Sequence, residues 1–358
     1  MKLRYLAAAM CVALPVVAGV ALAQQAGRGP ALSEAPLTGD GVAAPAAFPL
    51  QAAKGVDSGA KARPLPGSTN TGAFNKNTWK FGPRSTPAPG TPLWSPVKKK
   101  MVAGEKVYSA TINAHGTPEQ YCAAAMNPQY DFIWTEMQHS PGTYQNAALM
   151  WTACPGLAGM GEGKAHAMPG ARIPTTNEMD VQHATDMGAM VIVIPTIDSA
   201  AEAAEGVKWT YFPPMGRRSA GSNVAGQPIW WGAAPGGYRA TYNDNVTLIL
   251  MIETLEGISE ADQIAATKGV TGVFAASSDL GNFSGYGQGD PDYERLINIV
   301  HDATVKAKVR LCGPSAWNDR NDFTCFQGGP PAPGGRGAGR GRGARGAAPA
   351  AGAPAPAQ

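Results

Sequence analysis

Between Leu93 and Gln327, short apolar runs alternate along the chain with segments whose apolar residues recur at helical spacing. Two of the runs, MVIVIP at 190–195 and LILMIE at 248–253, are almost uninterrupted. Such runs are typical of parallel strands that are covered on both faces. The strands expected from this pattern are Lys106–Ile112, Asp131–Glu136, Ala171–Pro174, Met190–Pro195, Thr247–Glu253, Gly272–Ala276, Val309–Cys312 and Asp322–Phe326.

Helical segments fit between most of these strands. They are expected at Glu178–Met187, Ser199–Glu205, Ile258–Thr267 and Asp292–Lys306. Eight strands in strand–helix alternation predict an α/β fold, a (β/α)8 TIM barrel that extends over residues 93–327. In such a barrel the active site lies at the carboxyl ends of the strands.

Residues 1–23 have the pattern of a secretory signal peptide. Lys2 and Arg4 precede an apolar run, Leu6–Leu22, which closes on the small-residue triplet that ends at Ala23. Pro15 interrupts the run, so a cleaved signal fits better than a transmembrane anchor. We therefore expect export, most naturally to the periplasm, with cleavage after Ala23.

The flanking segments 24–92 and 328–358 are rich in Ala, Pro and Gly and have no sustained hydrophobic period. They are predicted to be a disordered arm and a disordered tail, because they cannot bury enough apolar surface to offset the entropy of ordering. The Arg-Gly pattern of the tail is similar to segments that contact RNA, but export argues against that use. A net charge of +3 is not extreme, and we expect no nucleic-acid partner and no stable membrane insertion.

Four cysteines follow the predicted cleavage site: Cys122, Cys154, Cys312 and Cys325. Disulfides persist in an oxidising compartment, and four cysteines allow three pairings. Cys312 with Cys325 closes the shortest loop and is the pairing we favour. Buried free thiols are an equally open interpretation.

Polar side chains gather where the predicted strands begin or end. Glu136 and His139 close strand two, Arg172 lies at the start of strand three, Glu253 ends strand five and Asp279 follows strand six. Two carboxylates from neighbouring strand ends repel each other unless a cation lies between them. Oxygen ligands without a nearby cysteine favour Mg²⁺ or Mn²⁺. The alternative is that Glu253 and Asp279 are helix caps or surface groups.

The same residues lie in longer motifs. These are DFIWTEMQHSP at 131–141, ARIPTTNEMDVQHATDMGAMVIVIP at 171–195, YFPPMGRRSAG at 211–221, LILMIETLEGI at 248–258 and GVTGVFAASSDLGNFSGY at 269–286. In these motifs the chain resembles the HpcH/HpaI aldolase and citrate-lyase β family, from about Trp94 to Gln327. The resemblance implies a class II aldolase that joins a pyruvate-like keto acid to an aldehyde, or cleaves the product.

The resemblance also implies a role for each residue at the strand ends. Glu253 and Asp279 would bind a divalent metal that also holds the keto acid. Arg172 would stabilise the enolate that forms from pyruvate. His139 would be the general acid and base, oriented by Glu136. No Schiff-base lysine is needed.

Two further positions follow from the resemblance. The backbone N–H groups of Ser278 and Asp279 would hold the substrate carboxylate. Asp186 matches an acidic position that in relatives reaches the active site of a neighbouring subunit, which makes a homo-oligomer the expected assembly.

The sequence departs from the family pattern in several places. Glu136 stands where an aspartate is usual, and Gln138 where a glutamate is common. Ala276 and Ser277 replace a common Gly-Pro pair. Low-complexity sequence begins soon after strand eight, where relatives continue into helices exchanged between subunits.

Two other functions are open at this stage. A CoA-ester lyase of the citrate-lyase β kind shares the arginine and the carboxylates but generally lacks the histidine. A non-catalytic periplasmic protein that binds a keto acid is the second. The acceptor aldehyde is expected to contact the loops 154–170 and 219–245, where Trp230, Trp231 and Tyr238 could stack on a substrate or pack in the core.

Overall fold

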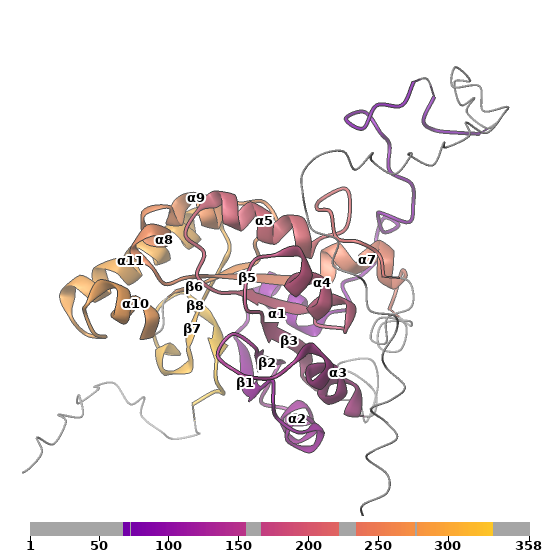
Figure 1. The fold of residues 1–358 in the computed structure, drawn as a ribbon. Coiled ribbons are helices and arrows are strands. Elements are labelled where there is room, and N and C mark those ends of the chain that lie inside the picture. Colours follow the sequence, from indigo (N-terminus) through magenta and orange to yellow (C-terminus); the bar gives the residue numbers. More distant parts are fainter. Residues whose placement is uncertain (1–66, 72, 155–165, 222–233, 276–277, 332–358) are drawn as a thin grey trace, which may run out of the picture. The chain divides into compact units, whose positions relative to one another are not determined.

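The protein is described by a computed structural model that covers residues 67–71, 73–154, 166–221, 234–275 and 278–331 (Figure 1). The chain divides into two compact units after Ala73, and the barrel belongs to the second. Several expectations fall outside the described residues. These are the signal peptide, most of the arm, the tail beyond residue 331, Trp230, Trp231, Ala276 and Ser277.

Eight parallel strands close into a barrel in sequence order, so the predicted fold is confirmed (Figure 1). Every strand pairs in parallel with the next, and β8 pairs with β1. The strands are β1 Val107–Asn113, β2 Phe132–Glu136, β3 Met168–Arg172, β4 Val191–Ile194, β5 Thr247–Ile252, β6 Gly272–Ala275, β7 Arg310–Pro314 and β8 Phe323–Gln327.

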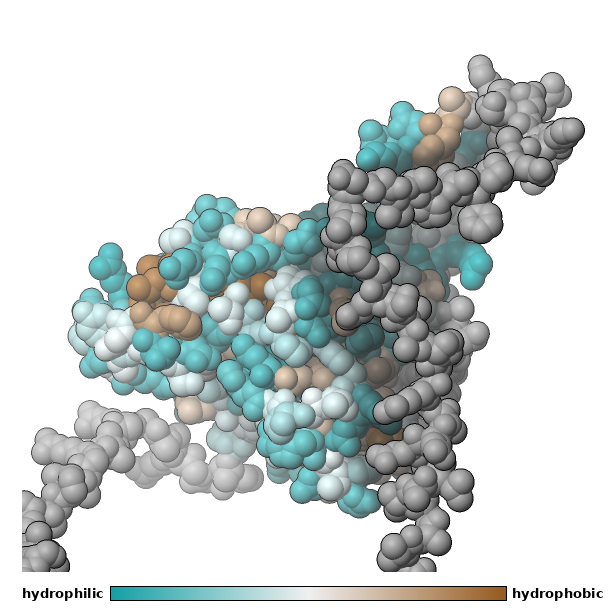
Figure 2. Space-filling model, viewed as in Figure 1, coloured by the Kyte–Doolittle hydropathy of each residue, from teal (hydrophilic) through white to brown (hydrophobic). Residues whose placement is uncertain are grey.

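Helices surround this barrel. They are α1 Pro96–Ala103, α2 Pro118–Ala125, α3 Tyr144–Ala153, α4 Glu178–Asp186, α5 Ala200–Thr210, α7 Tyr238–Asn245, α8 Leu255–Ser259, α9 Ala261–Ala266, α10 Ser278–Ser284, α11 Pro291–Ala307 and the short 3₁₀ helix η1 Ser315–Trp317. Figure 2 shows mostly hydrophilic side chains on the face it presents, with a smaller apolar group toward α10 and α11. Within the described residues, no helix has the length and apolarity needed to cross a membrane.

Polar caps explain why helices begin soon after several of the strands. The side chains of Thr143, Asn177, Ser199 and Thr254 each accept a hydrogen bond from a backbone N–H in the first turn of α3, α4, α5 and α8. Such caps satisfy N–H groups that have no partner within the helix. Each cap therefore fixes a short connection at the carboxyl end of a strand, which is the rim of the barrel.

The third strand differs from the prediction, Ala171–Pro174, at both ends. It begins at Met168 and ends at Arg172, so Arg172 is its last residue and not its first. Pro169 and Gly170 disguise the strand, because both residue types are rare in strand interiors. Gly170 is needed there, since a Cβ atom would come within 2.9 Å of the carbonyl oxygen of Ile133. The correction moves Arg172 to the rim.

The disulfide also differs from the favoured pairing. Cys122 of α2 is bonded to Cys154 after α3, with Cα atoms 5.3 Å apart. Cys312 and Cys325 are free, buried and paired in register on β7 and β8. Burial raises the pKa of the Cys312 thiol. Loop length alone gave the wrong pair, because the barrel packs α2 against α3 and brings their cysteines together.

Candidate active site

One row of side chains crosses the rim from β1 to β3. Asn113 pairs in register with Glu136, and Glu136 pairs with Arg172. Register partners on neighbouring parallel strands project from the same face of a sheet. The row therefore places Asn113 beside two residues that the sequence assigned to catalysis.

Glu136 is a buried hub of hydrogen bonds. Its Oε2 atom lies 2.6 Å from Nε of Arg172 and accepts a bond of 3.2 Å from the indole N–H of Trp134. Its Oε1 atom accepts from the backbone N–H groups of Gln138 at 2.9 Å and His139 at 3.0 Å. Glu136 thus fixes the Arg172 guanidinium and, through the main chain, the turn that presents His139.

His139 itself is exposed, in the turn that follows β2 at the rim. The preceding residue, Gln138, is half-buried, and its Oε1 atom is buried without a hydrogen-bond partner among the described residues. The orienting contact from Glu136 to His139 is made to the backbone. The extra methylene of Glu136, compared with an aspartate, suits a carboxylate that binds both this turn and Arg172.

Glu253 follows β5 and is almost completely buried, with 1% of its surface exposed. Its Oε1 atom accepts bonds from the backbone N–H and the hydroxyl of Thr196, at 2.9 and 3.0 Å. Thr196 holds a φ of +50°, which is unusual for a β-branched residue and is found most often at functional sites. The Oε2 atom of Glu253 has no hydrogen-bond partner in the described part of the chain.

Burial raises the pKa of Glu253, and the negative charge of Asp279 raises it further, while the bonds from Thr196 and the positive charge of Arg172 act against the increase. Asp279 and Arg172 are therefore near enough to act on the Glu253 carboxylate. The structure brings together at one rim the two carboxylates and the arginine that the sequence singled out. Ser278 and Asp279 begin α10, and Ser278 is exposed.

The residues at this rim fit a hard divalent cation. A buried carboxylate oxygen without a donor, next to a second carboxylate, is an acceptor pair that such an ion satisfies. Among the described residues no three His, Cys, Asp or Glu side chains form a metal-binding group. Two protein ligands are nevertheless sufficient for Mg²⁺, which usually keeps several waters and binds through one or two carboxylates.

Asp186 lies at the end of α4, and in this chain its carboxylate is engaged elsewhere. Arg218 donates to it at 2.8 Å, and Gln182 donates at 2.5 Å. The Arg218 guanidinium is buried against the neighbouring rings of Phe212 and Tyr242, with its Cζ atom 4.4 Å from each ring centre. Because α4 runs from the rim back toward the amino ends of the strands, Asp186 is distant from the rim row of its own chain.

Sequence reasoning missed Trp134, Thr196 and Arg218. Arg218 lies within a quoted motif, GRRSAG, but nothing there indicates which arginine is buried. Tyr238, one of the three aromatic residues considered for substrate stacking, packs against Trp94 and Tyr242 at ring distances of 6.4 and 5.3 Å. Core packing is therefore its role.

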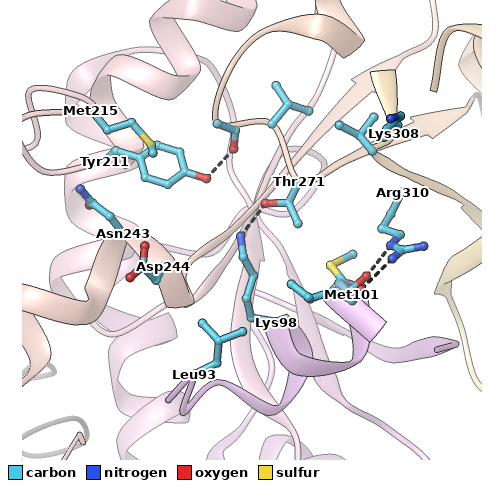
Figure 3. A pocket seen from close by; sticks show the side chains of 14 residues that line it. Leu93, Lys98, Met101, Tyr211, Met215, Asn243, Asp244, Thr271, Lys308 and Arg310 are labelled. Carbon is cyan, nitrogen blue, oxygen red and sulfur yellow. Dashed lines mark hydrogen bonds between the residues drawn. The ribbon is translucent and has the colours of Figure 1, made fainter. Parts of the chain in front are cut away.

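A separate cavity of about 520 Å³ lies at the opposite, amino end of the barrel (Figure 3). Lys98 donates there to the carbonyl oxygen of Val246 at 2.9 Å and to the hydroxyl of Thr271 at 3.0 Å, just before β5 and β6 begin. Although this cavity is large, catalysis in barrels of this type takes place at the carboxyl ends of the strands. We place the candidate active site at the rim.

The fold and the rim define a (β/α)8 barrel with an acidic, arginine-containing site at the carboxyl ends of its strands. The chain belongs to the HpcH/HpaI aldolase/citrate lyase family, whose sequence model matches residues 114–315.

Individual relatives agree with this assignment. The 2-keto-3-deoxy-L-rhamnonate aldolase of Klebsiella pneumoniae is 28% identical over 226 residues, which cover 63% of this chain and 78% of the relative. The 5-keto-4-deoxy-D-glucarate aldolase of Salmonella arizonae is 32% identical over 186 residues, 51% of this chain and 68% of the relative. A crystal structure of a family member from Burkholderia cenocepacia matches with a TM-score of 0.56 at 25% identity, over 66% of this chain and 93% of that one.

Proposed function

We propose that the protein is a divalent-metal-dependent aldolase that forms or cleaves 4-hydroxy-2-keto acids through the enolate of pyruvate. The observation that carries the proposal is the unpartnered, buried Oε2 atom of Glu253 next to the charges of Asp279 and Arg172. The named activities of the related aldolases support it, because both act on keto-deoxy sugar acids.

Glu253 and Asp279 would hold the metal, Mg²⁺ or Mn²⁺ by the chemistry of the oxygen ligands. When bound, the metal supplies a positive charge that holds the keto acid and makes its methyl group more acidic. Thr196 fixes one oxygen of Glu253 with two hydrogen bonds, which leaves the other oxygen directed away from the protein donors.

Arg172 stabilises the negative charge that develops on the keto oxygen. Its guanidinium is held by the ion pair with Glu136 and lies 5.9 Å from the Trp134 ring centre, so it does not have to reorganise as charge develops. Backbone N–H groups of Ser278 and Asp279 would bind the substrate carboxylate, as the family resemblance implies.

His139 is the general acid and base, placed at the rim by the hydrogen bond from its backbone N–H to Glu136. In the cleavage direction His139 removes the proton of the C4 hydroxyl group. The C3–C4 bond breaks, its electron pair passes to the enolate of pyruvate, and the aldehyde leaves. Protonation of the enolate at C3 completes the reaction, and synthesis follows the reverse path.

Exchange of deuterium from solvent into the methyl group of pyruvate tests this proposal. An aldolase should catalyse the exchange with Mg²⁺ or Mn²⁺, lose it in the presence of a chelator and regain it when the metal is restored. A protein that only binds a keto acid should catalyse none. Turnover of a CoA ester without exchange would instead favour the citrate-lyase β kind of activity.

We also propose that the protein is exported to the periplasm. The Cys122–Cys154 disulfide supports an oxidising compartment, because such bonds are rare in the cytosol. Amino-terminal sequencing of the mature protein from a periplasmic fraction should begin at Gln24. A mature protein that begins at Met1 in the cytosolic fraction would refute export.

A further inference from the structure

A second cavity lies at the rim, where β1 leads into α2. Its volume is about 490 Å³. We name it the β1 corner pocket, and it is lined by Thr111, Ile112, Asn113, His115, Gly116, Thr117 and Gln120.

The β1 corner pocket adjoins the catalytic row. Asn113, one of its lining residues, is the register partner of Glu136. The backbone N–H of Ala114 donates to the carbonyl oxygen of Glu136 at 2.9 Å. His115 forms a hydrogen bond of 2.9 Å between Nδ1 and the hydroxyl of Ser140, the residue that follows His139. One wall of the pocket is thus joined to the turn that presents the proposed acid and base.

The pocket is open on one side because the carboxyl-terminal residues of β1 extend beyond the segment that pairs with β8. Strand β8 pairs only with the residues Val107–Ser109, and Gly328 forms an isolated bridge with Ser109. The side chains of Thr111 and Asn113, which continue the same face of β1, are exposed. A substrate that extends from the Glu136–Arg172 pair toward β1 would therefore enter this pocket.

The pocket combines polar groups that carry no fixed charge with apolar surface, which includes the side chain of Ile112. Its lining contains hydroxyl, amide and imidazole groups and no Lys, Arg, Asp or Glu. The side-chain oxygens of Thr117 and Gln120 each accept a backbone N–H of the other residue in a capping box at the start of α2, with bonds of 3.3 and 3.1 Å. The polar side chains that lie outside this capping box are those of Asn113, His115 and Thr111.

We infer that the β1 corner pocket is the acceptor subsite and that it selects a hydroxylated, uncharged aldehyde, such as a short sugar aldehyde. Hydroxyl groups both donate and accept, so they match the amide of Asn113 and the hydroxyl of Thr111. An apolar aldehyde would displace water from these groups and would not replace the hydrogen bonds that the water makes. An aldehyde that bears a carboxylate would meet no lysine or arginine in the lining of the pocket. The inference rests on the proposed aldolase function.

The test compares D-glyceraldehyde with propanal, which has the same carbon chain without hydroxyl groups. Asn113→Leu keeps the approximate volume of the side chain and removes its hydrogen bonds. The measured quantity is the ratio of the two kcat/KM values, alongside deuterium exchange into pyruvate by the same preparation. Loss of one hydrogen bond to the acceptor should lower the ratio about tenfold. Thr111→Val makes the same test at a second exposed position, in case Asn113→Leu does not fold.

Asn298→Leu is the matched control, because Asn298 is exposed on the outer face of α11. It should leave the ratio and the exchange unchanged. If the ratio stays at the wild-type value in Asn113→Leu and Thr111→Val while exchange proceeds, the pocket is not the acceptor subsite. A wild-type preference for glyoxylate, which is charged, would overturn the substrate class. Absence of exchange in the wild type would show that the proposed aldolase function has failed, and the subsite with it.

Discussion

The charged side chains at the two ends of the barrel differ in their hydrogen bonding. At the amino end, Lys98 donates to the hydroxyl of Thr271 at 3.0 Å, and Arg310 donates to the backbone carbonyl oxygen of Met101 (Figure 3). At the rim, an oxygen of the buried Glu253 accepts no hydrogen bond from the described residues. An unsatisfied buried acceptor destabilises a fold, so a ligand that completes it explains its presence. The cations at the amino end therefore have acceptors within the described residues, whereas the rim holds a buried acceptor that is left for a ligand.

Substitution of Glu253 should have the largest effect and would break this comparison if it did not. Glu253→Gln should lower kcat/KM by about 10³-fold or more, because a catalytic metal contributes several kcal/mol and each 1.36 kcal/mol is a factor of ten. The melting temperature should not fall much, since the change removes a buried charge. Steady-state kinetics and thermal melting of the same preparation test both statements. Near-normal turnover would show that Glu253 is structural.

Arg172 should show an effect on both activity and stability. Arg172→Met removes the charge that we propose to stabilise the enolate and should lower kcat/KM by about 10²–10³-fold. It also leaves Glu136 buried without its counter-ion, which should cost about 3–5 kcal/mol of unfolding free energy.

The double variant Arg172→Met/Glu136→Gln separates these two effects. It should recover part of the lost stability, measured by urea unfolding, and none of the lost activity. Recovery of activity together with stability would mean that Arg172 acts only as a structural partner of Glu136.

Much of the barrel was predictable from the sequence because parallel strands covered on both faces leave long apolar runs. The runs at 190–195 and 248–253 contain β4 and β5 to within a residue or two at each end. The start of β3 was missed because Pro169 and Gly170 give no strand signal, although the neighbouring strands determine the pairing there. Local patterns therefore identify elements more reliably than their ends.

The sequence predicted which residues belong to the candidate site, but it did not predict the contacts between them. Strand ends indicated Glu136, Arg172 and Glu253, but the ion pair between the first two depends on the register of β2 and β3. No sequence signal marks Thr196 as the residue that holds Glu253, because a threonine with positive φ is rare. Cysteine pairing failed for a similar reason, since it depends on which helices the barrel packs together.

The disulfide offers a prediction about stability that should spare activity. Cys154 lies at the end of α3 that is directed away from the rim, so the bond to Cys122 is distant from the proposed active site. Cys122→Ser with Cys154→Ser should lower the unfolding free energy by about 2–4 kcal/mol and leave kcat unchanged. Thiol titration of the denatured mature wild type should detect Cys312 and Cys325. Four reactive thiols would mean that the bond is absent.

Lys98 gives the sharpest test of the amino end, because its expected effect on stability depends on pH. Burial lowers the pKa of Lys98 from 10.5 to about 8, with the charge of Asp244 acting in the opposite direction. Between pH 8 and 10.5 the unfolded chain therefore binds more protons at Lys98 than the folded protein does. The contribution of Lys98 to stability should rise with pH through this window, because the penalty for a buried ammonium group is relieved.

Lys98→Met measures this contribution against the wild type. The difference in unfolding free energy should shift in favour of the wild type by up to about 3 kcal/mol between pH 7.5 and 10.5, with no change in kcat. Lys99→Met is the matched control, since Lys99 is exposed on the same helix. Its difference from the wild type should be independent of pH. If the difference in unfolding free energy between Lys98→Met and the wild type is also independent of pH, Lys98 is solvated. The comparison between the two ends of the barrel would then no longer hold for the amino end.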